Sequence, residues 1–96
     1  MTGYHSHGTL CALISKYLKE QAPGVWFFRP MNMGYGRAGI PDFIVCRHGQ
    51  FVALEVKVGR DTLEPWQSRE VQAIQAAGGA ALVVRELADV VRIMEA

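Results

Sequence analysis

Two acidic residues and a lysine in the middle of the chain are spaced so that a β-hairpin would bring them together. Asp42 begins one apolar run, and Glu55 and Lys57 lie near the end of the next. Between the runs, His48-Gly49 suits a two-residue turn, because glycine readily accepts the positive φ that such turns need. In that register Asp42 faces Glu55.

The hydrophobic pattern of the two runs supports this register independently. Four apolar pairs then face each other: Val45 with Val52, Phe43 with Leu54, Cys46 with Phe51, and Ile44 with Ala53. Both faces of the hairpin are apolar, which is typical of a sheet covered on both sides.

Facing carboxylates about 5 Å apart destabilise a sheet unless a positive charge balances them. Lys57, two residues beyond Glu55, points to the same face and could be that charge. A divalent cation is the other candidate, since Mg²⁺ binds one or two carboxylates together with water and phosphate oxygens. Such an ion would polarise a phosphodiester and lower the pKa of a bound water, while Lys57 oriented that water or neutralised developing charge. The alternative is a surface ion triad at a strand end.

Hydrophobic periodicity, glycines and prolines predict the elements that position these residues. In order they are a helix from Thr9, a plausible N-cap, to about Gln21, a strand Val25–Arg29, a loop 30–41, strands Asp42–Arg47 and Gln50–Val58, a helix Pro65–Ala77, a strand Ala80–Arg85 and a helix Leu87–Glu95. Three successive strands predict antiparallel pairing, and the later β-α-β passage predicts a parallel neighbour. The predicted fold class is α/β (α+β), with a mixed four-stranded sheet flanked by helices.

The composition is that of one globular domain spanning residues 1–96. Half of the 96 residues are hydrophobic and 20% are charged, which excludes a disordered or collagen-like chain. The net charge of +1 hides an asymmetry: residues 29–60 carry five basic against two acidic residues, and residues 61–96 carry three against six. A locally basic segment can attract phosphates although the whole chain is nearly neutral.

Several features limit the cellular setting and other site chemistry. Cys11 and Cys46 form no CxxC pair, no apolar run is long enough for a membrane span, and the N-terminus lacks a signal-peptide pattern. We therefore expect a cytoplasmic protein without a membrane partner. His5, His7 and Cys11 lack a fourth zinc ligand at a usual spacing.

The aromatic residues and one further histidine have simpler interpretations. His48 is interpreted as a turn residue rather than a base. Trp26-Phe27-Phe28 is interpreted as core or dimer interface, whereas Trp66 could pack the helix start or lie at an interface.

The ordered set of motifs resembles a known family. Gly39-Ile40-Pro41-Asp42, then twelve residues, then Glu55-Val56-Lys57 resembles the PD-(D/E)XK nuclease signature on its restriction-endonuclease-like αβββαβα core. The details resemble the virus-type replication-repair nuclease (VRR-NUC) domain. They are Phe51-Val52-Ala53-Leu54-Glu55-Val56-Lys57, Leu63-Glu64-Pro65-Trp66-Gln67 and Ala76-Ala77-Gly78-Gly79-Ala80. The resemblance covers about residues 9–95.

The resemblance implies a Mg²⁺- or Mn²⁺-dependent DNA endonuclease that uses no nucleotide cofactor. Asp42 and Glu55 would bind the metal with the backbone carbonyl of Val56, and Lys57 would position or activate the attacking water. Gln67 matches a glutamine that supports the site in the family; otherwise it is a polar residue of the first helical turn, facing solvent.

One departure from the family concerns the first helix. Members usually carry a glutamate near its start that reaches the metal. Here that place falls at about His7, and no acidic residue precedes Glu20. Either His7 takes the role, or Glu20 reaches in, or the site does without it, which leaves the number of metal ions open.

The resemblance also implies the substrate and the assembly. Five residues flank the proposed site and could contact phosphates or stack on bases: Arg29, Asn32, Tyr35, Arg37 and Arg60. Stand-alone VRR-NUC domains resemble Holliday-junction resolvases and act as homodimers, so we expect a structure-selective nuclease of DNA repair that prefers four-way junctions, of phage or bacterial origin. The alternatives are a small flap-cutting or nicking nuclease and a non-catalytic DNA-binding module.

Overall fold

Helices and strands follow one another in the order that the sequence predicts. The computed structural model describes residues 6–31 and 36–96. Within them the elements are α1 (His7–Lys19), β1 (Val25–Phe28), β2 (Phe43–Arg47), β3 (Gln50–Val56), α2 (Pro65–Ala76), β4 (Ala80–Val84) and α3 (Leu87–Glu95). The αβββαβα order is confirmed, and most element boundaries lie within one or two residues of the predicted ones.

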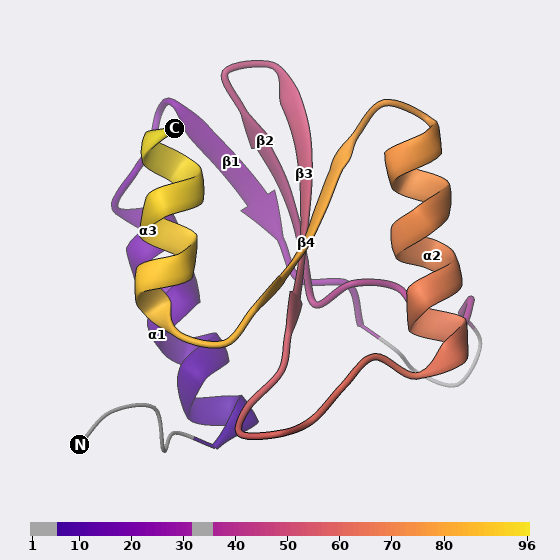
Figure 1. Ribbon diagram of the computed structural model, residues 1–96. Coiled ribbons are helices and arrows are strands. Elements are labelled where there is room, and N and C mark those ends of the chain that lie inside the picture. The colour runs from indigo at the N-terminus through magenta and orange to yellow at the C-terminus, as the bar shows by residue number, and fades with distance from the viewer. Residues whose placement is uncertain (1–5, 32–35) are drawn as a thin grey trace.

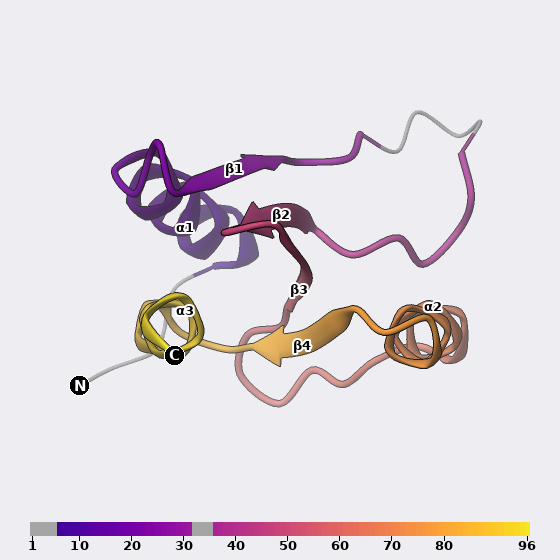
Figure 2. The same ribbon diagram turned by 90° about the horizontal axis from the view of Figure 1, so that it is seen from above.

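The four strands form one mixed sheet in the order β1-β2-β3-β4 (Figure 1). The first three pair antiparallel, whereas β3 and β4 pair parallel because α2 carries the chain from one to the other. Seen from above, α1 and α3 cover one face of the sheet and α2 stands on the other (Figure 2). The predicted sheet with helices on both faces is thus confirmed.

The register of the central hairpin is the predicted one. Phe43 faces Leu54 and Val45 faces Val52 across β2 and β3. The turn between them has φ of 49° at His48 and 82° at Gly49. Positive φ at both central residues gives the turn a twist that matches the flanking strands.

The core lies between the sheet and the pair α1 and α3. Its fully buried side chains come from both helices and from three of the four strands: Leu10, Ile14, Leu18, Phe43, Val45, Leu54, Val84 and Val90. This face is closed, so it fixes the β2–β3 hairpin against α1.

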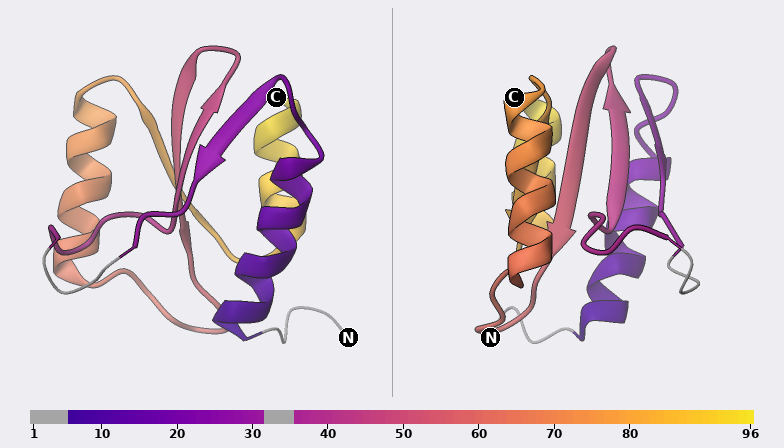
Figure 3. Two further views of the ribbon diagram at one scale, coloured as in Figure 1. Left: turned by 180° about the vertical axis from the view of Figure 1, so that it is seen from behind. Right: turned by 90° about the vertical axis from the view of Figure 1, so that its right-hand side faces the viewer.

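The opposite face is only partly covered, which corrects the prediction of a hairpin buried on both sides. Gln75 of α2 donates a hydrogen bond to the Ala81 carbonyl in β4 (3.1 Å), so α2 packs beside the β4 edge. The right panel of Figure 3 shows α2 in front of the sheet on the β4 side. The opposite edge of the sheet is β1, which lies next to α1. Trp26 and Phe51 remain 61% and 45% exposed on the uncovered part.

The start of α1 differs from its prediction. Ser6, not Thr9, is the N-cap: its hydroxyl accepts a hydrogen bond from the Thr9 backbone N–H (3.1 Å). Serine and threonine are both good caps, so the sequence alone does not discriminate between them. The earlier start places His7 in the first turn of the helix.

Two further observations concern the described residues. Cys11 is buried and Cys46 is exposed, and both are free thiols. None of the described helices is both long enough and apolar enough to cross a bilayer.

Candidate active site

Two carboxylates meet where β2 begins and β3 ends. Asp42 directly precedes β2, and its backbone N–H donates to a Glu55 carboxylate oxygen (3.2 Å). The Val56 N–H in turn donates to Oδ2 of Asp42 (2.8 Å). These reciprocal bonds hold the two acidic side chains opposite each other, as the hairpin register predicts.

The environment of Glu55 opposes its ionisation. The residue is only 3% exposed. Burial, followed by the negative charge of Asp42 and a hydrogen bond between the two carboxyl groups, raises the pKa of Glu55 to about 8. The positive charge of Lys57 acts in the other direction but is the weaker influence. At neutral pH the Glu55 carboxyl group therefore favours its protonated, uncharged form.

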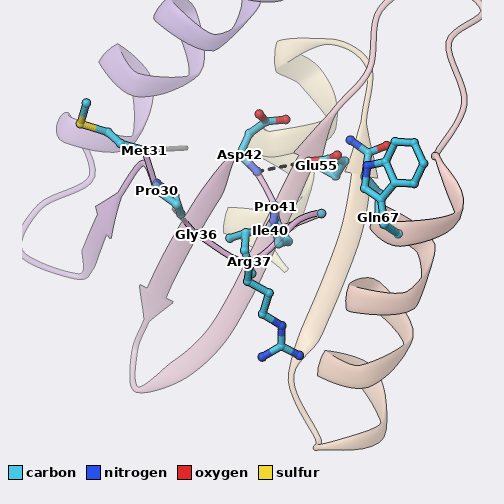
Figure 4. Close-up of a pocket in the computed structure, with 11 residues that line it drawn as sticks. Pro30, Met31, Gly36, Arg37, Ile40, Pro41, Asp42, Glu55 and Gln67 are labelled. Carbon is cyan, nitrogen blue, oxygen red and sulfur yellow. Dashed lines mark hydrogen bonds between the residues drawn. The ribbon is translucent and has the colours of Figure 1, made fainter. Parts of the chain in front are cut away.

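A cavity of about 300 Å³ opens beside the carboxylates. Figure 4 shows it between the 36–42 loop, Glu55 and the start of α2. Its polar lining consists of Arg37, Asp42, Glu55 and Gln67, and its apolar lining consists of Pro30, Met31, Ile40, Pro41 and Trp66. The remaining lining residues are Gly36 and Gly39.

Gln67 serves the helix and also faces the cavity. Its side-chain oxygen accepts a hydrogen bond from the Glu64 backbone N–H (2.8 Å), which caps the first turn of α2. That bond orients the side chain and leaves its NH₂ group available as a donor. Gln67 thus combines the first-turn role with a place in the cavity lining.

Gly39 allows the loop before Asp42 to lie directly on α2. Its φ is +84°, and a Cβ atom there would approach the Trp66 carbonyl oxygen to 2.3 Å. Both observations require glycine. The sequence shows several glycines in this loop but gives no signal for which one contacts α2.

His7 lies at the site, whereas Glu20 does not. The Nε2 atom of His7 is 3.4 Å from Oδ2 of Asp42. Glu20 is the C-cap of α1, so the helix separates it from His7 by roughly 20 Å. Of the two candidates for the place of the family glutamate, only His7 is near the carboxylates.

The described residues contain no group of three His, Cys, Asp or Glu side chains placed to hold a metal ion by themselves. The zinc interpretation involved His5, which lies outside these residues. A cation at Asp42 and Glu55 would therefore complete its coordination with backbone, water or substrate oxygens, as Mg²⁺ does in proteins.

Lys57 follows directly after β3 and is half-buried. Its backbone N–H donates a hydrogen bond to the Val84 carbonyl (3.0 Å), which fixes the backbone position from which the side chain extends. Among residues 6–31 and 36–96, no ion pair joins its ammonium to Asp42 or Glu55. Within that part of the chain, the facing carboxylates thus lack a direct lysine or arginine partner.

The residues considered for DNA contact are distributed unevenly. Arg37 lines the cavity, but its Nε donates to Glu70 (2.6 Å), and the side chain extends away from the carboxylates (Figure 4). The guanidinium of Arg29 lies 4.9 Å from the Phe43 ring centre. Arg60 is exposed and does not line the cavity. Asn32 and Tyr35 lie outside the described residues.

A comparison with solved structures decides the family. A structure described as "VRR_NUC domain" is 30% identical to this chain, with a TM-score of 0.68, over 88% of this chain and 92% of the other. This chain belongs to the VRR-NUC domain family. A second structure, "VRR_NUC domain protein", superposes with a TM-score of 0.75 over 95% of this chain and 86% of the other. At 16% identity it supports the fold alone. No protein-family model and no curated protein matches the chain.

Membership of the VRR-NUC family establishes the fold of the chain and its class of activity. The mixed four-stranded sheet flanked by helices is the restriction-endonuclease-like fold of VRR-NUC domains, and the chain is a nuclease domain. The resemblance inferred from the sequence is confirmed.

The raised pKa of Glu55 makes a prediction about the metal-free VRR-NUC domain. The pKa of Glu55 rises from 4.5 in the unfolded chain to about 8 in the folded domain, so the folded state binds this proton more tightly. The resulting contribution to the free energy of unfolding is fully present below pH 4.5 and is lost as the pH rises to 8. A tenfold change in an acid dissociation constant corresponds to about 1.4 kcal/mol, so we expect a loss of a few kcal/mol in the free energy of unfolding. Urea denaturation in EDTA across this pH range measures it.

Glu55→Gln is the matched control, since it keeps the size and removes the titration. The variant should be more stable than the wild type at the alkaline end and should lack most of the pH dependence. Parallel pH profiles for the two proteins would contradict the assignment.

Proposed function

We propose that this VRR-NUC domain is a Mg²⁺- or Mn²⁺-dependent endonuclease that hydrolyses DNA phosphodiesters with water as the nucleophile. The observation that carries the proposal is the carboxylate pair, Asp42 and Glu55, held face to face beside an open cavity. Facing carboxylates, one of them buried, are costly to a fold, and a divalent cation bound between them would offset that cost.

The donor set fits a hard divalent cation. Asp42 and Glu55 supply carboxylate oxygens, and the Val56 carbonyl follows directly in the chain. Oxygen donors of this kind, completed by water and phosphate, suit Mg²⁺ and Mn²⁺. His7 beside Asp42 either orients that carboxylate or adds a nitrogen donor. When bound, the cation supplies Lewis-acid polarisation of the phosphodiester.

The neighbouring side chains would act on the water and the phosphate. Lys57, held at its backbone by β4, orients the attacking water and balances the negative charge that develops on the phosphate. Gln67 offers its NH₂ group to the water or to a phosphate oxygen. Water forms the new bond to phosphorus, the bond to the leaving oxygen breaks, and that oxygen takes up a proton.

We propose branched DNA, and four-way junctions in particular, as the preferred substrate. The basic middle segment would attract phosphates, with Arg29, Arg37 and Arg60 as described candidates and Asn32 and Tyr35 as candidates outside the described residues. Flap cutting or nicking is the alternative activity. A non-catalytic DNA-binding module is less well supported, because binding alone gives no reason for facing carboxylates.

We propose that two copies pair through the uncovered part of the sheet. We define the aromatic face as Trp26, Phe28, Ile44, Cys46 and Phe51, which alternate with core-facing residues on β1, β2 and β3. None of these residues is charged, and the ring centroids of Trp26 and Phe28 lie 5.7 Å apart. Uncharged aromatic surface is typical of the centre of a protein interface. A dimer would supply two cleavage sites for a symmetric junction.

Lys57→Ala should abolish cleavage while leaving junction binding largely intact, because the lysine acts on the water and contributes little to affinity. The loss should be at least about 100-fold in rate. A gel assay on four-way junction, flap and linear duplex with Mg²⁺, Mn²⁺ or EDTA measures cleavage, and a mobility shift in EDTA measures binding.

Lys19→Ala is the control, since Lys19 lies at the far end of α1 and should leave both readouts unchanged. A fully active Lys57→Ala protein would overturn the role of the lysine. Metal-independent binding without product on any substrate would overturn the nuclease proposal as a whole, and single asymmetric cuts would overturn only the junction preference.

Trp26→Glu should separate the proposed dimer, because a carboxylate would be buried without a partner in the aromatic face. Light scattering after size exclusion should give twice the chain mass of 10.6 kDa for the wild type and the single mass for the variant. Leu82→Glu, which changes an exposed apolar residue of β4 on the other face, should stay dimeric. A monomeric wild type, or a dimeric Trp26→Glu protein, would refute this interface.

A further inference from the structure

We propose that the active-site cavity contains a nucleobase subsite, in which Trp66 stacks on an unpaired base next to the cleaved phosphate. The inference rests on the proposed function and adds to it the feature of DNA that this site would select. Its basis is the distribution of exposed apolar side chains around one cavity, together with the way α2 is held there.

Exposed apolar side chains gather at this cavity. Met31, Ile40 and Trp66 are 78%, 38% and 46% exposed, and all three line it. The aromatic face lies on the strands and does not include them. Apolar side chains left in water at a cavity mouth, beside a few convergent polar groups, are the usual composition of a ligand site.

The cavity lining offers groups for both parts of a nucleotide. Asp42 and Glu55 contribute carboxylates, where a bound cation would place the phosphate. Trp66, one residue before Gln67 at the start of α2, contributes an aromatic ring to the same lining. A cavity of about 300 Å³ is at the small end of ligand sites, so it suits one base rather than several.

The backbone of Trp66 is held in place by the loop that carries Asp42. The close approach of Gly39 to the Trp66 carbonyl ties the start of α2 to that loop. The Gln67–Glu64 hydrogen bond fixes the same helical turn. An indole presented from a fixed backbone loses little conformational freedom on stacking, which favours tight contact.

Stacking on Trp66 requires a base that is free of its neighbours. Both faces of a base inside a duplex are covered by adjacent base pairs, so only an unpaired or displaced base offers a face to an aromatic side chain. Junction centres, flaps and frayed ends provide such bases. The subsite would therefore make the enzyme selective for branched or single-stranded positions rather than for a base sequence.

Fluorescence tests the subsite directly, because the chain has two tryptophans. Trp26→Phe leaves Trp66 as the single tryptophan, so the tryptophan fluorescence then reports on this residue alone. Lys57→Ala in the same protein prevents cleavage. In EDTA, we expect quenching of Trp66 by a flapped duplex and by a four-way junction, and little quenching by a linear duplex of the same sequence. Equal quenching by all three DNAs, or none by any, would overturn the proposal.

Affinity gives the second readout. Trp66→Ala in the Lys57→Ala background should weaken binding of flap and junction by about 5-fold to 150-fold, the range for loss of one stacked base, and leave linear duplex unchanged. Trp66→Phe should recover most of the loss, because phenylalanine also stacks. Leu82→Ala, an exposed apolar change away from the cavity, is the matched control.

The outcomes separate the subsite from the proposed function. If Trp66→Ala bound all three DNAs as before, or lost affinity equally for all three, the subsite would be overturned. Cleavage of any substrate by the wild-type protein would still leave the nuclease proposal standing. A wild type that neither binds nor cuts DNA would overturn both.

Discussion

The candidate active site depends on two carboxylates that the fold holds facing each other at the end of a hairpin. Asp42 and Glu55 would repel each other if both were ionised, and burial makes the charge on Glu55 costlier still. Reciprocal hydrogen bonds from the backbone of the facing strands hold them together. The rest of the fold supplies the free energy that keeps this unfavourable pair in place.

Each surrounding element has an identifiable part in that task. The turn at His48 and Gly49 sets the register, and a slip of one residue would turn Glu55 to the opposite face. The core beneath α1 and α3 prevents that slip, since it would expose the apolar row of Phe43 and Leu54. Gly39 then brings the start of α2 to the open side of the pair. The cavity follows from these constraints together.

Local patterns predicted the hairpin, the element order and the facing carboxylates, because turn chemistry and alternating apolar pairs act over short stretches of sequence. The predicted start of α1 was wrong, since Ser6 and Thr9 are both suitable caps and the hydrogen bond that identifies Ser6 as the cap is visible only in the structure. The exposure of Phe51 was not predicted, and that of Trp26 was only one of two alternatives, because an apolar strand face has the same pattern whether a helix covers it or not. The pairing of Arg37 with Glu70 joins distant segments through side chains alone and carries no sequence signal.

The central proposal is that Asp42 and Glu55 together bind a divalent cation. Calorimetric titration of the metal-free protein with MnCl₂ at neutral pH, in two buffers of different ionisation enthalpy, counts the protons released per bound ion. Because the pKa of Glu55 is about 8 before the ion binds, we predict release of about one proton per ion, and loss of binding in Asp42→Asn. Binding without proton release, or undiminished binding by Asp42→Asn, would contradict the claim.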